Sequence, residues 1–390
     1  MPFLGGGITM AGDYKAEKNE TEKKILVLTV DYPNNNGGVA LMYVHVRNKY
    51  YIENGIDVTV LNFSAKENYE IEGIKVIGKE SYEKSHGNYD TLVLHAANIR
   101  NHFQFLLKHE KEFAHIVFFF HGHEVLKIND TYPAPYSYLG KDNCLRVLLQ
   151  NVYDDFKLSV WHRYLPKLAY KSDYIFISNW FYEQFQKYVR LSDEGLNYRV
   201  HIINNSVGEI FEKNNYCYEG EKEFDFISIR SYMDGSKYCI DIINGFAVKY
   251  PEYKFLIVGK GDFYKYNQKP SNVTWIDRYL KHEEILSYVN KAKCALLPTR
   301  LDAQGVMMCE FATYGIPVIT SDLDVCREVL GDLQNIGYID NEDIDSVDLK
   351  SLYQSFVADI PHDKCKKFNY AQTVKMEEQI IRNGLVENFN

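Results

Sequence analysis

The sequence predicts an α/β protein built from two doubly wound, Rossmann-like domains that face each other across a cleft. Short apolar runs bounded by turn residues, which are typical of buried parallel strands, alternate with segments that have helical spacing. The alternation stops once, in the polar stretch FEKNNYCYEGEKEF over residues 211–224, and then begins again. A length of 390 residues also fits two domains better than one core.

The first alternation predicts an N-terminal domain over residues 25–210. Its strands are predicted at 23–30, 57–63, 89–96, 115–122, 172–179 and 198–206. Helices are predicted over 39–55, where the pattern ends on a glycine, and over 180–191. Residues 1–24 are rich in glycine and charge and lack a signal-peptide pattern, so we expect a flexible extension.

The second alternation predicts a C-terminal domain over residues 211–370. Its strands are predicted at 224–231, 254–261, 273–277, 294–299 and 316–322. Its helices are predicted at 237–250, 282–292 and 306–314. Residues 371–390 are expected to form a last helix that could pack back on the N-terminal domain.

Composition and charge exclude several classes of protein. The formal net charge is −9, so no global positive field exists to hold nucleic acid. The seven cysteines are an odd set without a close CxxC pair, which indicates neither a disulfide framework nor a zinc ribbon. No apolar run approaches the length of a transmembrane helix. We therefore expect a cytoplasmic protein, while the oligomeric state stays open.

One aromatic cluster offers a peripheral contact with the inner face of a membrane. It could contact a membrane-bound lipid through Trp180, Phe181, Tyr182, Phe185 and Tyr188. At helical spacing, such a cluster is more often part of a core. The two interpretations remain open at this point.

Polar residues and glycines follow several predicted strands, where a doubly wound sheet binds its ligands. Gly37 and Gly38 open a helix whose backbone amides can approach an anion, although a flexible turn explains them about equally well. His121 follows a strand and can donate a hydrogen bond to a sugar hydroxyl or a phosphate. A metal site there would need further ligands that the sequence does not show, so no metal is expected.

Two cations and two carboxylates follow strands of the second domain. Arg230 ends a strand and Lys237 begins a helix, an arrangement that suits a diphosphate if both point to one place. From spacing alone, two solvated surface cations are the commoner case. Asp302 and Glu310 flank a loop with Gly305, and carboxylates accept hydrogen bonds from the hydroxyls of ribose or a hexose. The alternative is an ordinary helix that leads into an ordinary sheet.

These residues, in this order, resemble the retaining glycosyltransferases of the GT-B fold, specifically family four, the glycosyl transferases of group 1. The resemblance covers the chain from about Lys23 to the C-terminus. Its most specific part is the pair of acids separated by seven residues, Asp302 and Glu310, followed by FATYGIPVITSD. The stretches ISIRSYMDGSKYCIDIINGFA, YIFISNWFYEQF and HIINNSVGEIF also correspond to segments of the family.

The resemblance implies a role for each candidate residue. Arg230 and Lys237 would neutralise the leaving nucleoside diphosphate. Asp302 would hold the transferred sugar, Glu310 would hold the ribose hydroxyls, and His121 would lie near the reacting centre. The remaining contacts with the nucleotide sugar would come from Gly38, from the base-flanking pair Arg278 and Tyr279, and from the backbone amides of Gln304, Gly305 and Val306.

The resemblance also implies an activity. A hexose would move from a UDP- or GDP-linked donor to a glycan or lipid-linked saccharide, with retention and without a metal or other cofactor, in bacterial surface polysaccharide synthesis. Many family members carry Glu where this chain has Asp302, which leaves the donor sugar open. A silent binding subunit and a nucleotide-sugar epimerase are the alternatives. The pair Asp322 and Asp324, which resembles a metal-binding motif of another glycosyltransferase fold, is expected to be a helix-capping turn.

Overall fold

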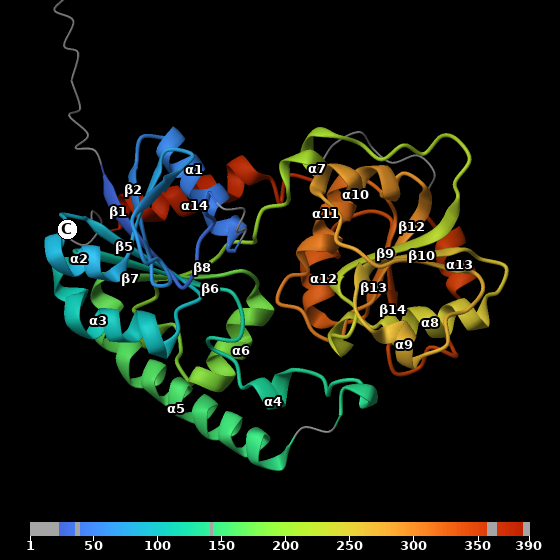
Figure 1. The fold of residues 1–390 in the computed structure, drawn as a ribbon, viewed down its shortest axis with the longest axis horizontal. Coiled ribbons are helices and arrows are strands. Elements are labelled where there is room, and N and C mark those ends of the chain that lie inside the picture. The colour runs from blue at the N-terminus through green and yellow to red at the C-terminus, as the bar shows by residue number, and fades with distance from the viewer. Residues whose placement is uncertain (1–22, 36–39, 141–142, 357–364, 385–390) are drawn as a thin grey trace, which may run out of the picture.

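The computed structural model describes residues 23–35, 40–140, 143–356 and 365–384. Two α/β domains lie side by side, each with its own sheet and its own helices (Figure 1). The predicted glycines Gly37 and Gly38 and almost all of the expected N-terminal extension lie outside the described residues. The predicted fold class is confirmed.

The N-terminal domain is built on an eight-stranded sheet with the order β3-β4-β2-β1-β5-β6-β7-β8. Its strands are β1 (Lys24–Thr29), β2 (Asp57–Asn62), β3 (Tyr69–Ile71), β4 (Ile74–Ile77), β5 (Thr91–His95), β6 (His115–Phe120), β7 (Ser172–Phe176) and β8 (Val200–Ile202). All neighbours pair in parallel except β3 and β4, which form an antiparallel hairpin at one edge. The central strands read as continuous apolar runs because both of their faces are buried.

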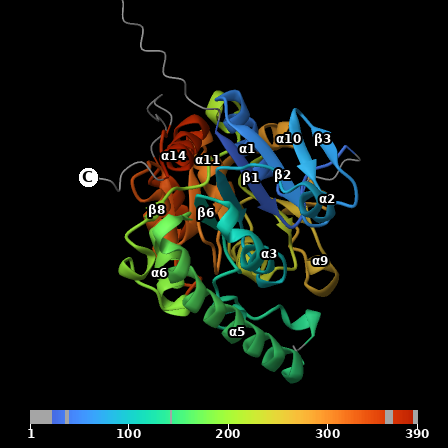
Figure 2. The ribbon, with the colours of Figure 1, turned by 90° about the vertical axis from the view of Figure 1, so that its left-hand side faces the viewer.

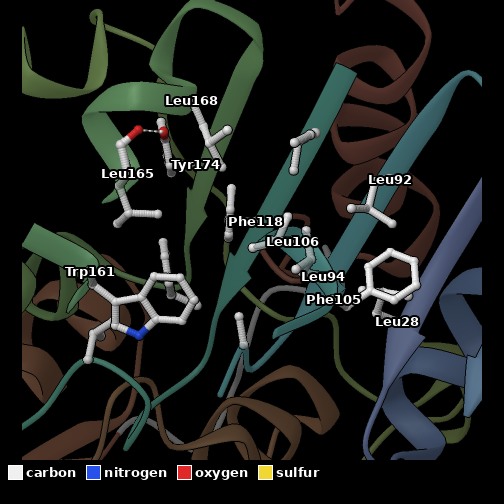
Figure 3. Packing of buried hydrophobic residues seen from close by; sticks show 14 of the residues in the cluster. Leu28, Leu92, Leu94, Phe105, Leu106, Phe118, Trp161, Leu165, Leu168 and Tyr174 are labelled. Carbon is white, nitrogen blue, oxygen red and sulfur yellow. Dashed lines mark hydrogen bonds between the residues drawn. The ribbon is translucent and has the colours of Figure 1, made fainter. Parts of the chain in front are cut away.

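Helices cover both faces of this sheet. One face packs on α2 (Lys79–Ser85), α3 (Gln104–His109), α5 (Cys144–Leu168) and α6 (Asn179–Val189). Figure 3 shows this core, in which Phe118 of β6 lies between Trp161 of α5 and Leu106 of α3. The other face packs on α1 (Met42–Glu53) and on the last helix, α14 (Tyr370–Asn383). A short helix, α4 (Ile128–Thr131), precedes α5.

A buried ion pair joins α14 to α1. Arg47 Nε lies 3.1 and 3.0 Å from the two carboxylate oxygens of Glu377, and the Tyr51 hydroxyl donates to the same carboxylate at 2.9 Å. Both partners of the pair are almost fully shielded from solvent. The chain thus crosses to the second domain and returns to end on the first, as the red α14 beside α1 shows in Figure 1.

The C-terminal domain is built on a six-stranded parallel sheet with the order β11-β10-β9-β12-β13-β14. Its strands are β9 (Phe224–Tyr232), β10 (Phe255–Lys260), β11 (Val273–Ile276), β12 (Ala292–Leu297), β13 (Val318–Ser321) and β14 (Ile336–Ile339). One face packs on α7 (Glu209–Lys213), α10 (His282–Val289), α11 (Val306–Tyr314) and α12 (Asp324–Leu330). The other face packs on α8 (Ile240–Lys249), α9 (Phe263–Tyr266) and α13 (Leu349–Gln354).

An arm of the N-terminal domain reaches the C-terminal domain. Between α4 and α5, the Tyr136 hydroxyl donates to Asp241 at 2.9 Å and the Tyr138 hydroxyl donates to Asp234 at 2.6 Å. The Tyr138 ring also stacks on Tyr266 with a centroid distance of 4.7 Å. These contacts hold the two domains together beside the candidate site. No sequence pattern predicted them.

Candidate functional site

A cavity of about 280 Å³ lies at the carboxyl ends of β9 and β12. The described residues that line it all belong to the C-terminal domain: Ile229, Arg230, Ser231, Lys237, Tyr238, Leu297, Thr299, Asp302, Gly305, Val306, Met307 and Met308. The cavity brings together five residues that the sequence singled out as a site: Arg230, Lys237, Asp302, Gly305 and Val306. Their roles remain predictions, but their convergence is a structural fact.

Arg230 supplies a partly desolvated positive charge. Its Nη2 donates to the Pro298 carbonyl at 2.8 Å, while its Nε is buried without a hydrogen-bond partner among the described residues. Burial lowers the pKa of Arg230, which means that the charge is costly where it lies. A buried donor left without a partner beside a cavity is a group that an anionic ligand would satisfy.

Lys237 brings a second positive charge to the same wall. It lies in the short 3-10 turn η6 (Ser236–Tyr238) that precedes α8. Its Nζ lies 4.7 Å from the centroid of the Tyr238 ring, and the Arg230 guanidinium carbon lies 5.4 Å from the same centroid. The ring therefore attracts both cations and holds their charges close together. Sequence reasoning missed Tyr238, although it directly follows Lys237.

The N-terminus of α11 adds a third positive contribution. Gly305 is its N-cap residue, with a φ of +72°, and a Cβ at this position would meet the Met308 methyl carbon at 2.3 Å. Glycine therefore fits here for both its conformation and its size. Because Val306 and Met307 line the cavity, the positive end of the helix dipole also faces it.

Asp302 shapes the loop that leads into α11. Its Oδ1 accepts hydrogen bonds from the backbone amides of Ala303 at 2.9 Å, Gln304 at 3.2 Å and Gly305 at 2.7 Å. The amides of Gln304 and Gly305 are therefore engaged by the loop itself, whereas the resemblance assigned them to the donor. Oδ2 makes no hydrogen bond to any residue that the structure describes, so one carboxylate oxygen is available for a ligand hydroxyl.

Gln304 belongs to the joint between the domains and not to the cavity wall. Its Nε2 donates to the Asn205 carbonyl at 2.9 Å, and the Asn205 amide donates to its Oε1 at 2.6 Å. The Asn205 side chain in turn accepts from Arg47 at 2.9 Å. Ser178 of the first domain also donates to the Ala303 carbonyl at 2.6 Å. The loop over residues 302–305 is thus held in place by residues of the N-terminal domain.

Glu310 does not share the cavity wall with Asp302, which corrects the expectation that both acids face one ligand. It is 7% exposed and lies on α11 against the segment that joins the two domains. Its Oε1 accepts from the Gly208 amide at 3.3 Å. Burial raises the pKa of Glu310 to about 7. A contact with ribose would require Glu310 to turn away from Gly208.

We expect Glu310→Gln to stabilise the protein by a few kcal/mol at about pH 8 and not at about pH 4. At low pH the carboxyl is protonated in both the folded and the unfolded chain. As the pH rises, the unfolded chain ionises first, near the usual value of 4.5, and stability falls until the folded group ionises near pH 7. Thermal unfolding at both pH values measures this, with the exposed Glu342→Gln as control. An equal loss of stability at both pH values would contradict the expectation.

His121 lies outside the cavity lining, in a cluster of aromatic rings. Its Nε2 is 3.1 Å from Nδ1 of His95, and the edge of the Tyr43 ring meets it at a centroid distance of 4.9 Å. Burial, aided by the Arg47 charge, lowers the pKa of His121 to about 3. The imidazole is therefore neutral near pH 7 and can exchange hydrogen bonds but carries no charge.

Arg278 and Tyr279 also lie outside the cavity lining. Arg278 forms a two-pronged ion pair with Glu284 of α10, at 3.1 and 2.8 Å. Tyr279 is 60% exposed, and Lys260 Nζ lies 5.4 Å from its ring centroid. The guanidinium of Arg278 is thus engaged within the protein, and the contact with a base remains a prediction for both residues.

The acidic pair Asp322 and Asp324 does not form the expected capping turn. The N-cap residue of α12 is Leu323, and no side chain caps this helix. Asp322 instead pairs with Arg327 through two contacts, one of them at 2.8 Å. A metal ion at this pair would have to compete with that guanidinium.

The aromatic cluster proposed for membrane contact belongs to the core. Phe181 and Phe185 are fully buried, and the other three members pack against the same cluster. Exposed apolar side chains occur instead on the first half of α5, which projects from the domain (Figure 2): Leu145, Leu148, Leu149, Val152, Tyr153 and Phe156. No helix within the described ranges is long and apolar enough to cross a membrane.

Comparison with known proteins identifies the family of the C-terminal half. Residues 226–349 match the family model described as glycosyl transferases group 1. This segment is similar to the group 1 glycosyltransferases. It contains every residue that lines the cavity, from Ile229 to Met308. No curated protein sequence matches the chain at a significant level.

Solved structures extend the likeness to both domains. Sucrose-phosphate synthase from Thermosynechococcus elongatus aligns with a TM-score of 0.64 at 12% identity, over 93% of this chain and 98% of that one. WaaG, a glycosyltransferase involved in lipopolysaccharide biosynthesis, aligns with a TM-score of 0.56 at 14% identity, over 94% and 96%. The catalytic domain of starch synthase IV from Arabidopsis thaliana, bound to ADP and acarbose, aligns with a TM-score of 0.56 at 12% identity, over 93% and 99%. The fold is GT-B, as the sequence predicted.

Proposed function

We propose that this chain transfers a hexose from a UDP- or GDP-linked donor to a glycan or lipid-linked saccharide, with retention of anomeric configuration. The observation that carries the proposal is the buried, unpartnered Arg230 Nε beside Lys237 and the N-terminus of α11. Three positive contributions at one cavity suit the two charges of a leaving nucleoside diphosphate. A silent binding subunit would not need this concentration of desolvated charge.

The cavity supports a route in which donor and acceptor react on the same face. Asp302 is the only carboxylate among its described lining residues, and three backbone amides hold its Oδ1. Since Oδ1 is engaged by the loop and we assign Oδ2 to a hydroxyl of the sugar, neither oxygen is left to form a covalent sugar–enzyme bond. The leaving phosphate is then the base that accepts the acceptor proton, while Asp302 Oδ2 binds a sugar hydroxyl. We propose that closure of the two domains over the donor excludes water and so limits its hydrolysis.

A metal ion is not required by this scheme, since Arg230, Lys237 and the α11 dipole supply the positive charge. We therefore expect transfer of labelled sugar to continue in EDTA, and we expect donor without acceptor to stay unchanged. Chromatography of the nucleotide sugar after incubation alone tests the second point. Interconversion of the donor without acceptor would establish the epimerase instead, and loss of transfer in EDTA that Mn²⁺ restores would overturn metal independence.

We assign contact with a lipid-linked acceptor to the exposed apolar half of α5. The exposed fraction of its six apolar side chains lies between 46% and 60%, an arrangement that marks an interaction surface. We expect the protein to float with neutral lipid vesicles and Leu149→Glu to abolish flotation while leaving transfer to a water-soluble acceptor intact. If the Leu149→Glu variant floats as the unchanged protein does, α5 is not the surface that contacts the membrane. With such a contact, the proposed role is surface polysaccharide synthesis in a bacterium, at the cytoplasmic face of the inner membrane.

A further inference from the structure

Three side chains that bind metal ions meet at the amino ends of β5 and β6. His86 follows α2, His109 ends α3, and Glu112 ends the adjoining 3-10 turn. Their ligand atoms all lie within 4.8 Å of one another. These strands belong to the sheet of the N-terminal domain, whereas the described residues that line the cavity all belong to the C-terminal domain, so the cluster is separate from the cavity.

The geometry of the cluster is close to that of a tetrahedral site. Nδ1 of His109 is 2.7 Å from Glu112 Oε1, and Nδ1 of His86 is 3.2 Å from Glu112 Oε2. Tetrahedral zinc with bonds of about 2.0–2.1 Å places its ligand atoms about 3.3 Å apart. Small rotations of these side chains are therefore enough to admit an ion between them.

The backbone at His86 adopts an unfavourable conformation that directs its imidazole toward Glu112. His86 has a φ of +50° and is followed by Gly87 with a φ of +58°. A residue other than glycine in this region is unfavourable by roughly 1 kcal/mol or more. The strained residue is the one that carries the imidazole toward Glu112. His109 and Glu112 are three positions apart on one helical turn, a spacing that places two ligands on one side.

The surroundings suit an ion with one open position. The side chain of His109 is 8% exposed, whereas those of Glu112 and His86 are 36% and 51% exposed, so an ion can enter from solvent. The Tyr82 hydroxyl donates to Glu112 Oε2 at 2.7 Å and orients the carboxylate from behind. Two imidazoles and one carboxylate form a ligand set that zinc completes with water.

We propose that His86, His109 and Glu112 bind a Zn²⁺ ion, with water as the fourth ligand. The ion joins the end of α2 to the end of α3. The same atoms would form a plain hydrogen-bonded cluster if no ion bound, so the alternative is a site that never takes up metal. The proposal is independent of the sugar transfer, because the cluster lies in the N-terminal domain and every described residue that lines the cavity belongs to the C-terminal domain.

The test is a titration of the full-length protein, stripped with EDTA and dialysed, with Zn²⁺ followed by calorimetry. One equivalent is expected to bind, and His86→Ala is expected to weaken binding by at least about tenfold. His86 is the preferred variant because its side chain is half exposed, so its loss does not open the core. Glu112→Gln provides a second variant that keeps the shape of the site. His162→Ala, which changes an exposed histidine of α5, is the matched control and should bind as the unchanged protein does.

Co²⁺ provides a spectroscopic reading of the same site. The unchanged protein with one equivalent of Co²⁺ should show the visible absorption of a tetrahedral N/O site, and His86→Ala should not. Zn²⁺ should also raise the melting temperature of the unchanged protein and not that of His86→Ala. Binding or absorption that is the same in His86→Ala, in Glu112→Gln and in the control would overturn the proposal, as would the absence of binding.

Discussion

Arg230→Ala and Lys237→Ala are each expected to lower kcat by about 100-fold or more. Either change removes a positive charge that stabilises the leaving diphosphate. The melting temperature should not fall in Arg230→Ala, because burial lowers the pKa of Arg230 and the charge already opposes folding. Initial rates of transfer and thermal unfolding, measured on the same preparations, separate the two effects.

The matched control for these two variants is Lys254→Ala. Lys254 is an exposed cation of the same domain, directly before β10, at the opposite edge of the sheet from the cavity. Its replacement changes the net charge by the same amount and should leave kcat unaltered. If Arg230→Ala and Lys237→Ala keep normal turnover, the cavity does not bind the diphosphate.

Asp302→Asn and Asp302→Ala are expected to differ in a way that separates the two carboxylate oxygens. Asparagine keeps an oxygen that can accept from the loop amides but loses the charge and the second acceptor. Asp302→Asn should therefore lower turnover by at least about tenfold while leaving the affinity for bare nucleoside diphosphate nearly unchanged. Asp302→Ala also releases the three amides and should cost roughly 1–3 kcal/mol of stability.

Glu310→Gln completes the comparison of the two acids. If Glu310 turns toward ribose when the nucleotide binds, its replacement should weaken the binding of the bare nucleotide by roughly 1–3 kcal/mol. Calorimetry with the nucleoside diphosphate measures this directly on both acid variants. Equal losses in Asp302→Asn and Glu310→Gln would show that the two acids act as one structural unit. No loss in either variant would favour an ordinary helix and loop.

The fold was predictable because both sheets bury both faces of their central strands. The runs KKILVLTV, HIVFFFHG and KFLIVGKG each contain an unbroken stretch of apolar residues and a parallel strand of the sheet. The edge strands β8 and β11 were also predicted, whereas the β3–β4 hairpin and β14 were missed. The hairpin of β3 and β4 is short and partly exposed, and β14 carries only four residues. Such segments have too few apolar residues to show a period.

The candidate site was predictable where it depends on single residues after strands and unpredictable where it depends on side-chain orientation. Arg230 and Lys237 meet because a strand end and a short turn bring them to the same ring. The sequence could not show that Asp302 Oδ1 would hold three amides, or that Glu310 would face Gly208 across the joint. The first depends on which way a side chain turns within its own loop, and the second on a contact between residues 102 positions apart.

The arm at Tyr136 and Tyr138 shows the same limit. The two tyrosine hydroxyls donate hydrogen bonds to Asp241 and Asp234 of the other domain. No local sequence periodicity predicts such long-range pairs. The zinc-ligand cluster was missed because its members are separated in sequence and only α2, α3 and the start of β6 bring them together.

The most direct test of the central claim is calorimetric binding of UDP and GDP to the unchanged protein, to Arg230→Ala and to Lys254→Ala. We expect one of these nucleotides to bind the unchanged protein and Lys254→Ala with the same affinity. In Arg230→Ala, its affinity should fall by about tenfold or more, since a charged hydrogen bond is lost. Equal affinity for all three proteins, or no binding of either nucleotide, would contradict the assignment of this cavity to the diphosphate of a sugar donor.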